Sequence, residues 1–176
     1  MSDTSTGPTS SLALLAIDAL TEFERVVDAI PAPGRGGPIG RLNPGWWTVL
    51  HVIRQADFLQ AMATGGDRDP WIIEHADAKE RMPFEDVRAA LARTRERLVA
   101  FCATATDEDL ERPTEQVEGV PTHLVGVPLQ QILARTTGHV FAHAGELSAL
   151  ASLMGAPDLG LPGAMPASRG LEPDAG

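Results

Sequence analysis

The chain has 176 residues, of which 43% are hydrophobic, and its formal net charge at pH 7 is -10. This length and this hydrophobic fraction fit one domain with a single core. The acidic balance repels nucleic-acid phosphates and anionic lipid head groups, so we expect no nucleic-acid partner and no membrane partner.

Cysteine usage and the first residues indicate a soluble cytoplasmic protein. Cys102 is the one cysteine, which excludes an intrachain disulfide and a cysteine-based zinc site and fits a reducing compartment. We interpret Cys102 as a small buried hydrophobic residue rather than a reactive thiol, because no histidine or lysine lies near it in sequence. The first ten residues lack the basic start of a signal peptide, and no segment approaches the roughly 20 apolar residues that cross a bilayer.

The first half of the chain predicts two long helices. Apolar residues recur every three or four positions from Ser11 to Ile30, as in an amphipathic helix. The proline- and glycine-rich stretch at 31–40 then predicts a long loop that contains neither helix nor strand. We expect this loop to cross the end of the bundle and to let the two long helices run parallel. Asn43 and Pro44 predict the start of the second helix, which covers 46–63.

The second half predicts two more long helices. A short helix around 72–78 precedes the third long helix, whose first turn holds Pro83. After one turn at 107–110 and a loop over 113–127, Pro128 opens the fourth long helix, which runs to Met154.

These elements predict one all-α domain. No segment alternates convincingly enough to be a strand, so we predict a four-helix bundle with a long loop between its first two helices. The bundle should cover residues 11–157, with flexible termini at 1–10 and 158–176.

Two histidines on the last predicted helix are candidate metal ligands. His139 and His143 lie four residues apart, so their side chains share one helical face and can reach one ion of the zinc or nickel type. His51 is the best third ligand because it lies in a core-forming stretch, whereas His75 and His123 lie in irregular segments. The alternative is a chance spacing, with each histidine held in the core by a hydrogen bond.

Glu146 lies on the same helical stripe, three residues after His143. An inward-pointing carboxylate is costly unless it is paired or close to a cation. Glu146 is therefore a candidate to orient a histidine, to act as a fourth ligand, or to act as a catalytic general base. The alternative is a partly exposed residue at the bundle end. Val140 stands where the zinc-protease motif requires glutamate, so peptidase chemistry is disfavoured.

Three segments together resemble the DinB-like superfamily: residues 47–53 (WTVLHVI), 139–147 (HVFAHAGEL) and 153–157 (LMGAP). Members of this superfamily are four-helix bundles with a three-histidine metal site, and the resemblance spans roughly residues 11–157. It implies that His51, His139 and His143 are the metal ligands. Where many relatives have glutamine, this chain has Glu146, which adds negative charge near the ion. The resemblance also implies a homodimer.

The resemblance carries an expectation about activity. The superfamily includes metal-dependent S-transferases for low-molecular-weight thiols such as bacillithiol, and the resemblance extends to the metal domain of mycothiol-dependent maleylpyruvate isomerase. It therefore implies a divalent metal ion, a low-molecular-weight thiol and a small-molecule electrophile. The abundance of alanine, glycine and arginine suggests a GC-rich bacterial genome, which favours a mycothiol-like thiol. The alternatives are a metal-assisted hydrolase that uses Glu146 and a non-catalytic bundle that binds a metal or ligand.

Two further expectations concern the surroundings of the site. The loop at 31–45 and the segment at 67–82 should frame the mouth of the pocket. Trp46, Trp47 and Trp71 are interpreted as packing residues rather than as residues that stack on a substrate.

Overall fold

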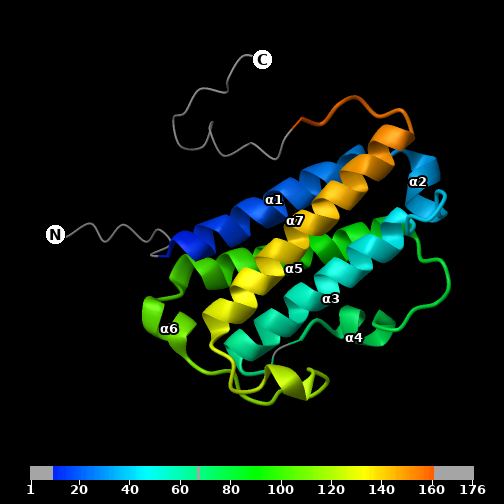
Figure 1. The fold of residues 1–176 in the computed structure, drawn as a ribbon. Helices are drawn as coiled ribbons and strands as arrows, with labels where there is room; N and C mark the ends of the chain where they lie inside the picture. Colours follow the sequence, from blue (N-terminus) through cyan, green and yellow to red (C-terminus); the bar gives the residue numbers. More distant parts are fainter. Residues whose placement is uncertain (1–9, 67, 161–176) are drawn as a thin grey trace.

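The computed structural model describes residues 10–66 and 68–160, and most of this part is helical (Figure 1). The long helices are α1 (Ser11–Ala29), α3 (Gly45–Thr64), α5 (Phe84–Thr104) and α7 (Leu129–Leu153). The short ones are α2 (Ala32–Gly36), α4 (Pro70–His75), α6 (Asp107–Glu111) and the 3-10 turn η1 (Thr122–Leu124). The described residues contain no strand, so the predicted all-α class is confirmed. Most of the two termini that we expected to be flexible, 1–9 and 161–176, lie outside the described residues.

The long helices form a closed ring in which α1 and α3 occupy opposite corners. Each of these two packs on both α5 and α7. Figure 1 shows that α1 and α7 run in one direction while α3 and α5 run in the other. The expectation of parallel first and second long helices is therefore wrong. The link after α1 crosses one end of the bundle diagonally, so α3 returns antiparallel to α1. The link that contains α4 runs back along the bundle to the start of α5, so α3 and α5 are the parallel pair that follow each other in the chain.

The proline- and glycine-rich link contains a short helix, α2, that its composition did not predict. Pro31 lies just before this helix and Pro33 in its first turn, where the missing N–H group breaks no intrahelical hydrogen bond. Gly34 is buried, and a Cβ atom there would lie 3.2 Å from Cγ2 of Ile30. Glycine at this position therefore lets α2 pack closely on the end of α1.

Three long helices begin immediately after a proline. Pro44, Pro83 and Pro128 each take the cap position before the helix, with ψ angles of 149°, 127° and 136°. Pro83 therefore precedes the first turn that it was predicted to occupy, and Pro44 takes the cap position predicted for Asn43. The physical reason is that a cap residue is extended, and the fixed φ of proline suits that conformation as well as it suits a first turn.

The core lies inside the ring and is built from one apolar stripe of each long helix. Large side chains that are 0 to 2% exposed include Phe23, Ile53, Leu91, Leu98, Leu133 and Leu147. Each contributes about 1.5 to 3 kcal/mol of burial free energy, so these stripes are the main stabilising contacts. Cys102 is fully buried among them, and burial raises the pKa of its thiol to about 11. The interpretation of Cys102 as a buried hydrophobic residue is therefore confirmed. No helix within 10–66 and 68–160 combines the length and the apolar character needed to cross a membrane.

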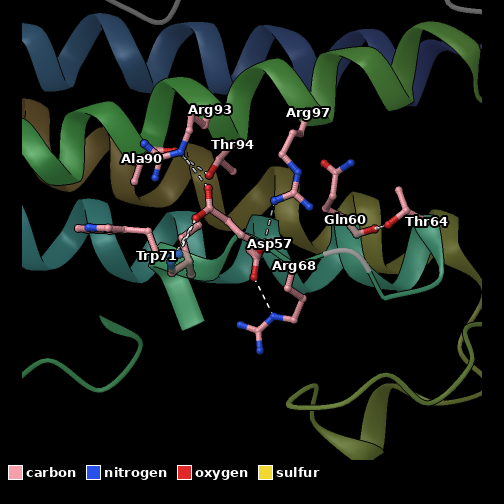
Figure 2. Close-up of polar contacts among 11 residues, drawn as sticks. Asp57, Gln60, Thr64, Arg68, Trp71, Ala90, Arg93, Thr94 and Arg97 are labelled. Atoms are coloured by element: carbon pink, nitrogen blue, oxygen red, sulfur yellow. Dashed lines mark hydrogen bonds and ion pairs between the residues drawn. The ribbon is translucent and has the colours of Figure 1, made fainter. Parts of the chain in front are cut away.

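A buried carboxylate on α3 connects that helix to α5 and to the segment before α4. Asp57 is 1% exposed, and Figure 2 shows it between Arg68 and Arg97. Its oxygens accept from Nε of Arg68 at 2.8 Å, Nη1 of Arg97 at 3.3 Å and the backbone N–H of Asp69 at 2.9 Å. Because a buried charge is costly unless it is paired, these contacts hold α3 in one orientation against α5.

Asp69 is a second buried carboxylate, 7% exposed, at the start of α4. It accepts from Nε of Arg93 at 3.0 Å and from the backbone N–H groups of Trp71 and Ile72 at 2.9 and 3.4 Å. Burial alone would raise the pKa of Asp69, but Arg93 and the two N–H groups outweigh burial and hold this pKa below its ordinary value of 3.8.

This lowered pKa predicts how Asp69 affects stability in acid. Because the folded pKa lies below the unfolded one, the carboxylate contributes stability that is complete above the unfolded value and is lost as the pH falls through the folded value. The Asp69→Asn variant keeps the helix cap, and its free energy of unfolding should fall less steeply than that of wild type below about pH 3.8. Urea denaturation over a pH series measures this slope. Asp77→Asn, at a side chain that is 89% exposed, is the control, and equal slopes for wild type and Asp69→Asn would contradict the prediction.

Candidate metal centre

The antiparallel neighbours α3 and α7 bring the three predicted histidines together. Nε2 of His139 lies 3.0 Å from Nε2 of His51 and 3.1 Å from Nε2 of His143. The buried residues Val140 and Ala144, each one position after a histidine, anchor this stretch of α7 in the core. One ring nitrogen from each histidine belongs to a set whose members all lie within 4.8 Å of one another. A metal in this cluster stays a prediction, while the convergence of His51, His139 and His143 is a structural observation.

The carboxylate of Glu146, about one helical turn after His143, fixes the tautomer of the His143 ring. Nδ1 of His143 donates to Oε2 of Glu146 at 2.6 Å, so the proton stays on Nδ1 and the lone pair on Nε2 faces the other histidines. Glu146 thus acts on the far side of the ring, which fits the predicted orienting role. Within the described residues its oxygens do not belong to the converging set of ligand atoms. A catalytic role for Glu146 stays a prediction.

Two rings of the histidine cluster, His51 and His139, have lowered pKa values and are neutral at neutral pH. Burial, reinforced by the nearby His143 and His51, lowers the pKa of His139 to about 4. Burial and His143 also lower the pKa of His51. Neutral imidazole is the form that binds a metal ion, so these two rings need lose no proton to act as ligands.

The ring nitrogens of the cluster cannot all be satisfied by hydrogen bonds to one another, which fits a bound cation. Nε2 of His139 faces two other Nε2 atoms, and the single proton that it could carry cannot make a linear hydrogen bond to both. Nδ1 of His139 is buried and has no hydrogen-bond partner within the described residues. A cation between the three Nε2 atoms would accept all three lone pairs at once, which no arrangement of protons achieves.

The spacing of the nitrogen atoms also fits a metal ion. Metal–nitrogen bonds of about 2.0 to 2.1 Å place two ligand nitrogens roughly 2.9 Å apart at right angles and roughly 3.4 Å apart in a tetrahedron. The distances of 3.0 and 3.1 Å from His139 lie within this range. The residues therefore fit a divalent ion with three imidazole ligands.

Tryptophan covers one of the three rings. The indole of Trp47 stacks on His51 with ring centroids 5.2 Å apart and an angle of 5° between the rings. Trp47 is 36% exposed, so it shields the histidine ring rather than filling the core, whereas Trp46 is buried as expected of a packing residue. Trp71 stacks on His75 in the same way. The spacing of four residues between Trp47 and His51, one helical turn, was the available sequence signal for this contact.

A cavity of about 320 Å³ begins at the histidine cluster and extends between α3 and α7. Its walls are formed by residues that follow His51 on α3 and precede His139 on α7 at intervals of about one helical turn. The lining residues are His51, Gln55, Phe58 and Met62 from α3, Ile132, Arg135, Thr136 and His139 from α7, and Pro121, His123 and Leu124 at the far end. Sequence reasoning did not single out Gln55, Arg135 or Thr136, although each lies about one turn from a candidate ligand.

The predicted pocket mouth is wrong. Among the described residues, the cavity is lined by the 121–124 segment and by none from the 31–45 loop or the 67–82 segment. The reason is the direction of the helices, because the cavity runs toward the end of α3 and the start of α7, and the loop before α7 lies there. The 31–45 loop lies at the other end of the bundle (Figure 1). Asp69 of the 67–82 segment instead contacts Asp57.

Removal of the Glu146 charge gives a direct test of its orienting role. The Glu146→Gln variant keeps a hydrogen-bond acceptor for His143 but loses the carboxylate, so affinity for Zn²⁺ should fall about 10- to 100-fold. Competition with a chromophoric chelator measures this affinity. Glu80→Gln, at an exposed position that does not line the cavity, is the control. Unchanged affinity in Glu146→Gln would remove Glu146 from the metal centre.

These observations define a class, namely helical bundles that gather histidines from two antiparallel helices at the end of a cavity. The family model of the DinB superfamily matches residues 11–147, and the chain belongs to this superfamily. A crystal structure of a DinB-like protein from Bacillus subtilis has a similar fold, with a TM-score of 0.60 and 14% sequence identity. The match covers 86% of this chain and 97% of that one. No curated protein matches the sequence significantly.

Proposed function

We propose that this protein is a metal-dependent enzyme that joins a low-molecular-weight thiol, such as a mycothiol-like thiol, to a small electrophile. One observation carries the proposal: three converging imidazoles, two of them with lowered pKa values, lie at the end of a cavity of about 320 Å³. That volume is in the range of small-molecule sites. The family membership supports the proposal as an analogy of fold.

Different residues would have different roles in such a reaction. His51, His139 and His143 would hold the ion, and zinc, nickel, copper and iron all suit imidazole ligands. When bound, the ion supplies Lewis acidity that lowers the pKa of a thiol toward neutrality. Glu146 keeps the proton of His143 on Nδ1 throughout, so that Nε2 stays free as a ligand atom. Phe58 and Ile132 line the cavity and would exclude water from the part of it where the electrophile would lie.

The proposed step conserves atoms and electrons. The sulfur atom gives an electron pair to the electrophilic carbon and forms a new carbon–sulfur bond. The leaving group departs with the electron pair of the bond that breaks, and the thiol proton passes to solvent. No oxidant or reductant takes part.

The test begins with metal content. Protein purified without a histidine tag should hold about one equivalent of metal per chain by elemental analysis, and the metal-loaded protein should consume mycothiol or bacillithiol in the presence of a model electrophile. The control is His51→Ala under the same conditions. Thiol consumption no faster than in this control would refute the proposal, and turnover of esters without any thiol would favour the hydrolase that uses Glu146.

A further inference from the structure

The cavity beside the histidine cluster is lined by a basic side chain in a protein that is strongly acidic overall. The chain has 24 acidic and 14 basic residues, yet among the residues that the structure describes no aspartate or glutamate lines this cavity. Arg135 does line it, and the charge of its guanidinium is close enough to His139 to contribute to the lowered pKa of that ring. Such a cavity attracts a negatively charged ligand.

Three polar side chains that line this cavity have unused hydrogen-bonding capacity. Arg135, Thr136 and Gln55 all line the cavity, and none has a hydrogen-bond partner or ion-pair partner for its side chain within 10–66 and 68–160. Arg135 is exposed, Gln55 is half-buried and Thr136 is buried, whereas Arg68 and Arg97 are paired with the buried carboxylate of Asp57. A guanidinium, a hydroxyl and an amide N–H can all donate to one carboxylate, and arginine does so with two parallel bonds.

Helix geometry places these donors at one level of the cavity. Thr136 and Arg135 precede His139 by three and four residues, and Gln55 follows His51 by four. Because α3 and α7 are antiparallel, both sets lie toward the same end of the bundle, about one helical turn or roughly 5 Å from the histidines. The next level is apolar, with Phe58 and Ile132, followed by Met62 and Leu124.

We propose that Arg135, Thr136 and Gln55 form a carboxylate subsite, so that the ligand of this cavity is a small organic acid with an apolar portion. One guanidinium balances one carboxylate. The distance of about one turn puts that carboxylate about three or four bonds from an atom held at the histidine cluster. The inference deepens the proposed function by naming a substrate class, and the carboxylate can belong either to the thiol or to the electrophile.

The first experiment uses metal-free protein, so that it does not depend on the proposed metal chemistry. We expect 4-phenylbutyrate to bind at least about tenfold more tightly than 4-phenylbutyramide, as measured by NMR titration, because only the acid pairs with Arg135. Arg135→Gln should remove this preference and Arg135→Lys should retain part of it. Arg41→Gln is the matched control, since Arg41 is exposed and does not line the cavity. Equal binding of acid and amide, equal binding of the acid to wild type and Arg135→Gln, or no binding of either ligand would overturn the subsite.

The second experiment uses Zn²⁺-loaded protein and distinguishes the two sources of the carboxylate. If the thiol carries it, 3-mercaptopropionate should bind more tightly than 3-mercaptopropionamide, and Arg135→Gln should abolish the difference. If the electrophile carries it, 4-phenylbutyrate and the neutral thiol 2-mercaptoethanol should bind together, each without weakening the other. If Arg135→Gln still binds the acid more tightly than the amide, the carboxylate binds the metal ion rather than Arg135, and the subsite is overturned. Failure of Zn²⁺ to bind, with the acid preference intact in metal-free protein, would refute the proposed function alone.

Discussion

Replacement of Asp57 by alanine should lower the free energy of unfolding by about 3 to 5 kcal/mol, the usual effect of removing one partner from a buried ion pair. The variant would leave Arg68, whose side chain is 9% exposed, without its carboxylate. Arg97 and the backbone N–H of Asp69 would each lose a hydrogen bond as well. The large cost therefore comes from unpaired donors as much as from the lost attraction. Urea denaturation at neutral pH measures it.

Two variants make this prediction specific. Asp57→Asn keeps the shape and one acceptor oxygen but no charge, so its stability should lie between wild type and Asp57→Ala. Asp77→Ala removes an ion pair with Arg54 whose carboxylate is exposed, and should cost no more than about 1 kcal/mol. If Asp57→Ala is no less stable than Asp77→Ala, the buried network does not stabilise the bundle as described.

The Asp57 network also connects stability with the candidate site. It holds α3, which carries both His51 and one wall of the cavity. The guanidinium of Arg68 lies 4.9 Å from the ring centroid of Phe58, and Phe58 lines the cavity. A partly folded Asp57 variant should therefore bind ligands in the cavity less well even though Asp57 itself does not line it.

The helices and the candidate ligands could be predicted because their signals are local. Apolar spacing gave α1 within one residue of its end, and the interval of four residues between His139 and His143 requires only that α7 be helical. His51 could be added because a histidine within an apolar stretch of a helix faces inward. These inferences depend on the helical period, which a single sequence displays.

The parts that could not be predicted depend on how helices are placed relative to one another. The direction of α3 decides which loop meets the cavity, and the composition of the 31–45 loop carries no information about that direction. Gln55 and Arg135 belong to helices that are far apart in sequence, so their meeting at one level of the cavity requires the antiparallel packing of α3 on α7. Asp57 is different, because it shares a helical face with Ile53 and Ala61, four residues away on either side, and a charged residue on an apolar face is a visible signal of a buried ion pair.

Replacement of His51 by alanine should weaken metal binding by more than about 100-fold, beyond the loss expected when only an outer hydrogen bond to a ligand is removed. His51 is the one member of the cluster on α3, so the variant leaves two imidazoles on a single helix. Wild type at a free Zn²⁺ concentration about 100 times its Kd should gain about 2.7 kcal/mol of stability from binding. The same concentration should give the variant no more than about 0.4 kcal/mol.

Thermal unfolding with and without Zn²⁺ reads out this difference, because about 1 kcal/mol shifts the Tm of a chain of this size by about 2 to 4 °C. The shift should be about 5 to 10 °C for wild type and about 1 °C for His51→Ala. His75→Ala is the matched control: its ring is held by the carbonyl of Trp71 outside the cluster, so its shift should equal that of wild type. A full shift in His51→Ala would mean that α7 alone holds the ion. An ion that bridges α3 and α7 instead couples the two walls of the cavity, so metal binding would also fix the distance between Gln55 and Arg135 across it.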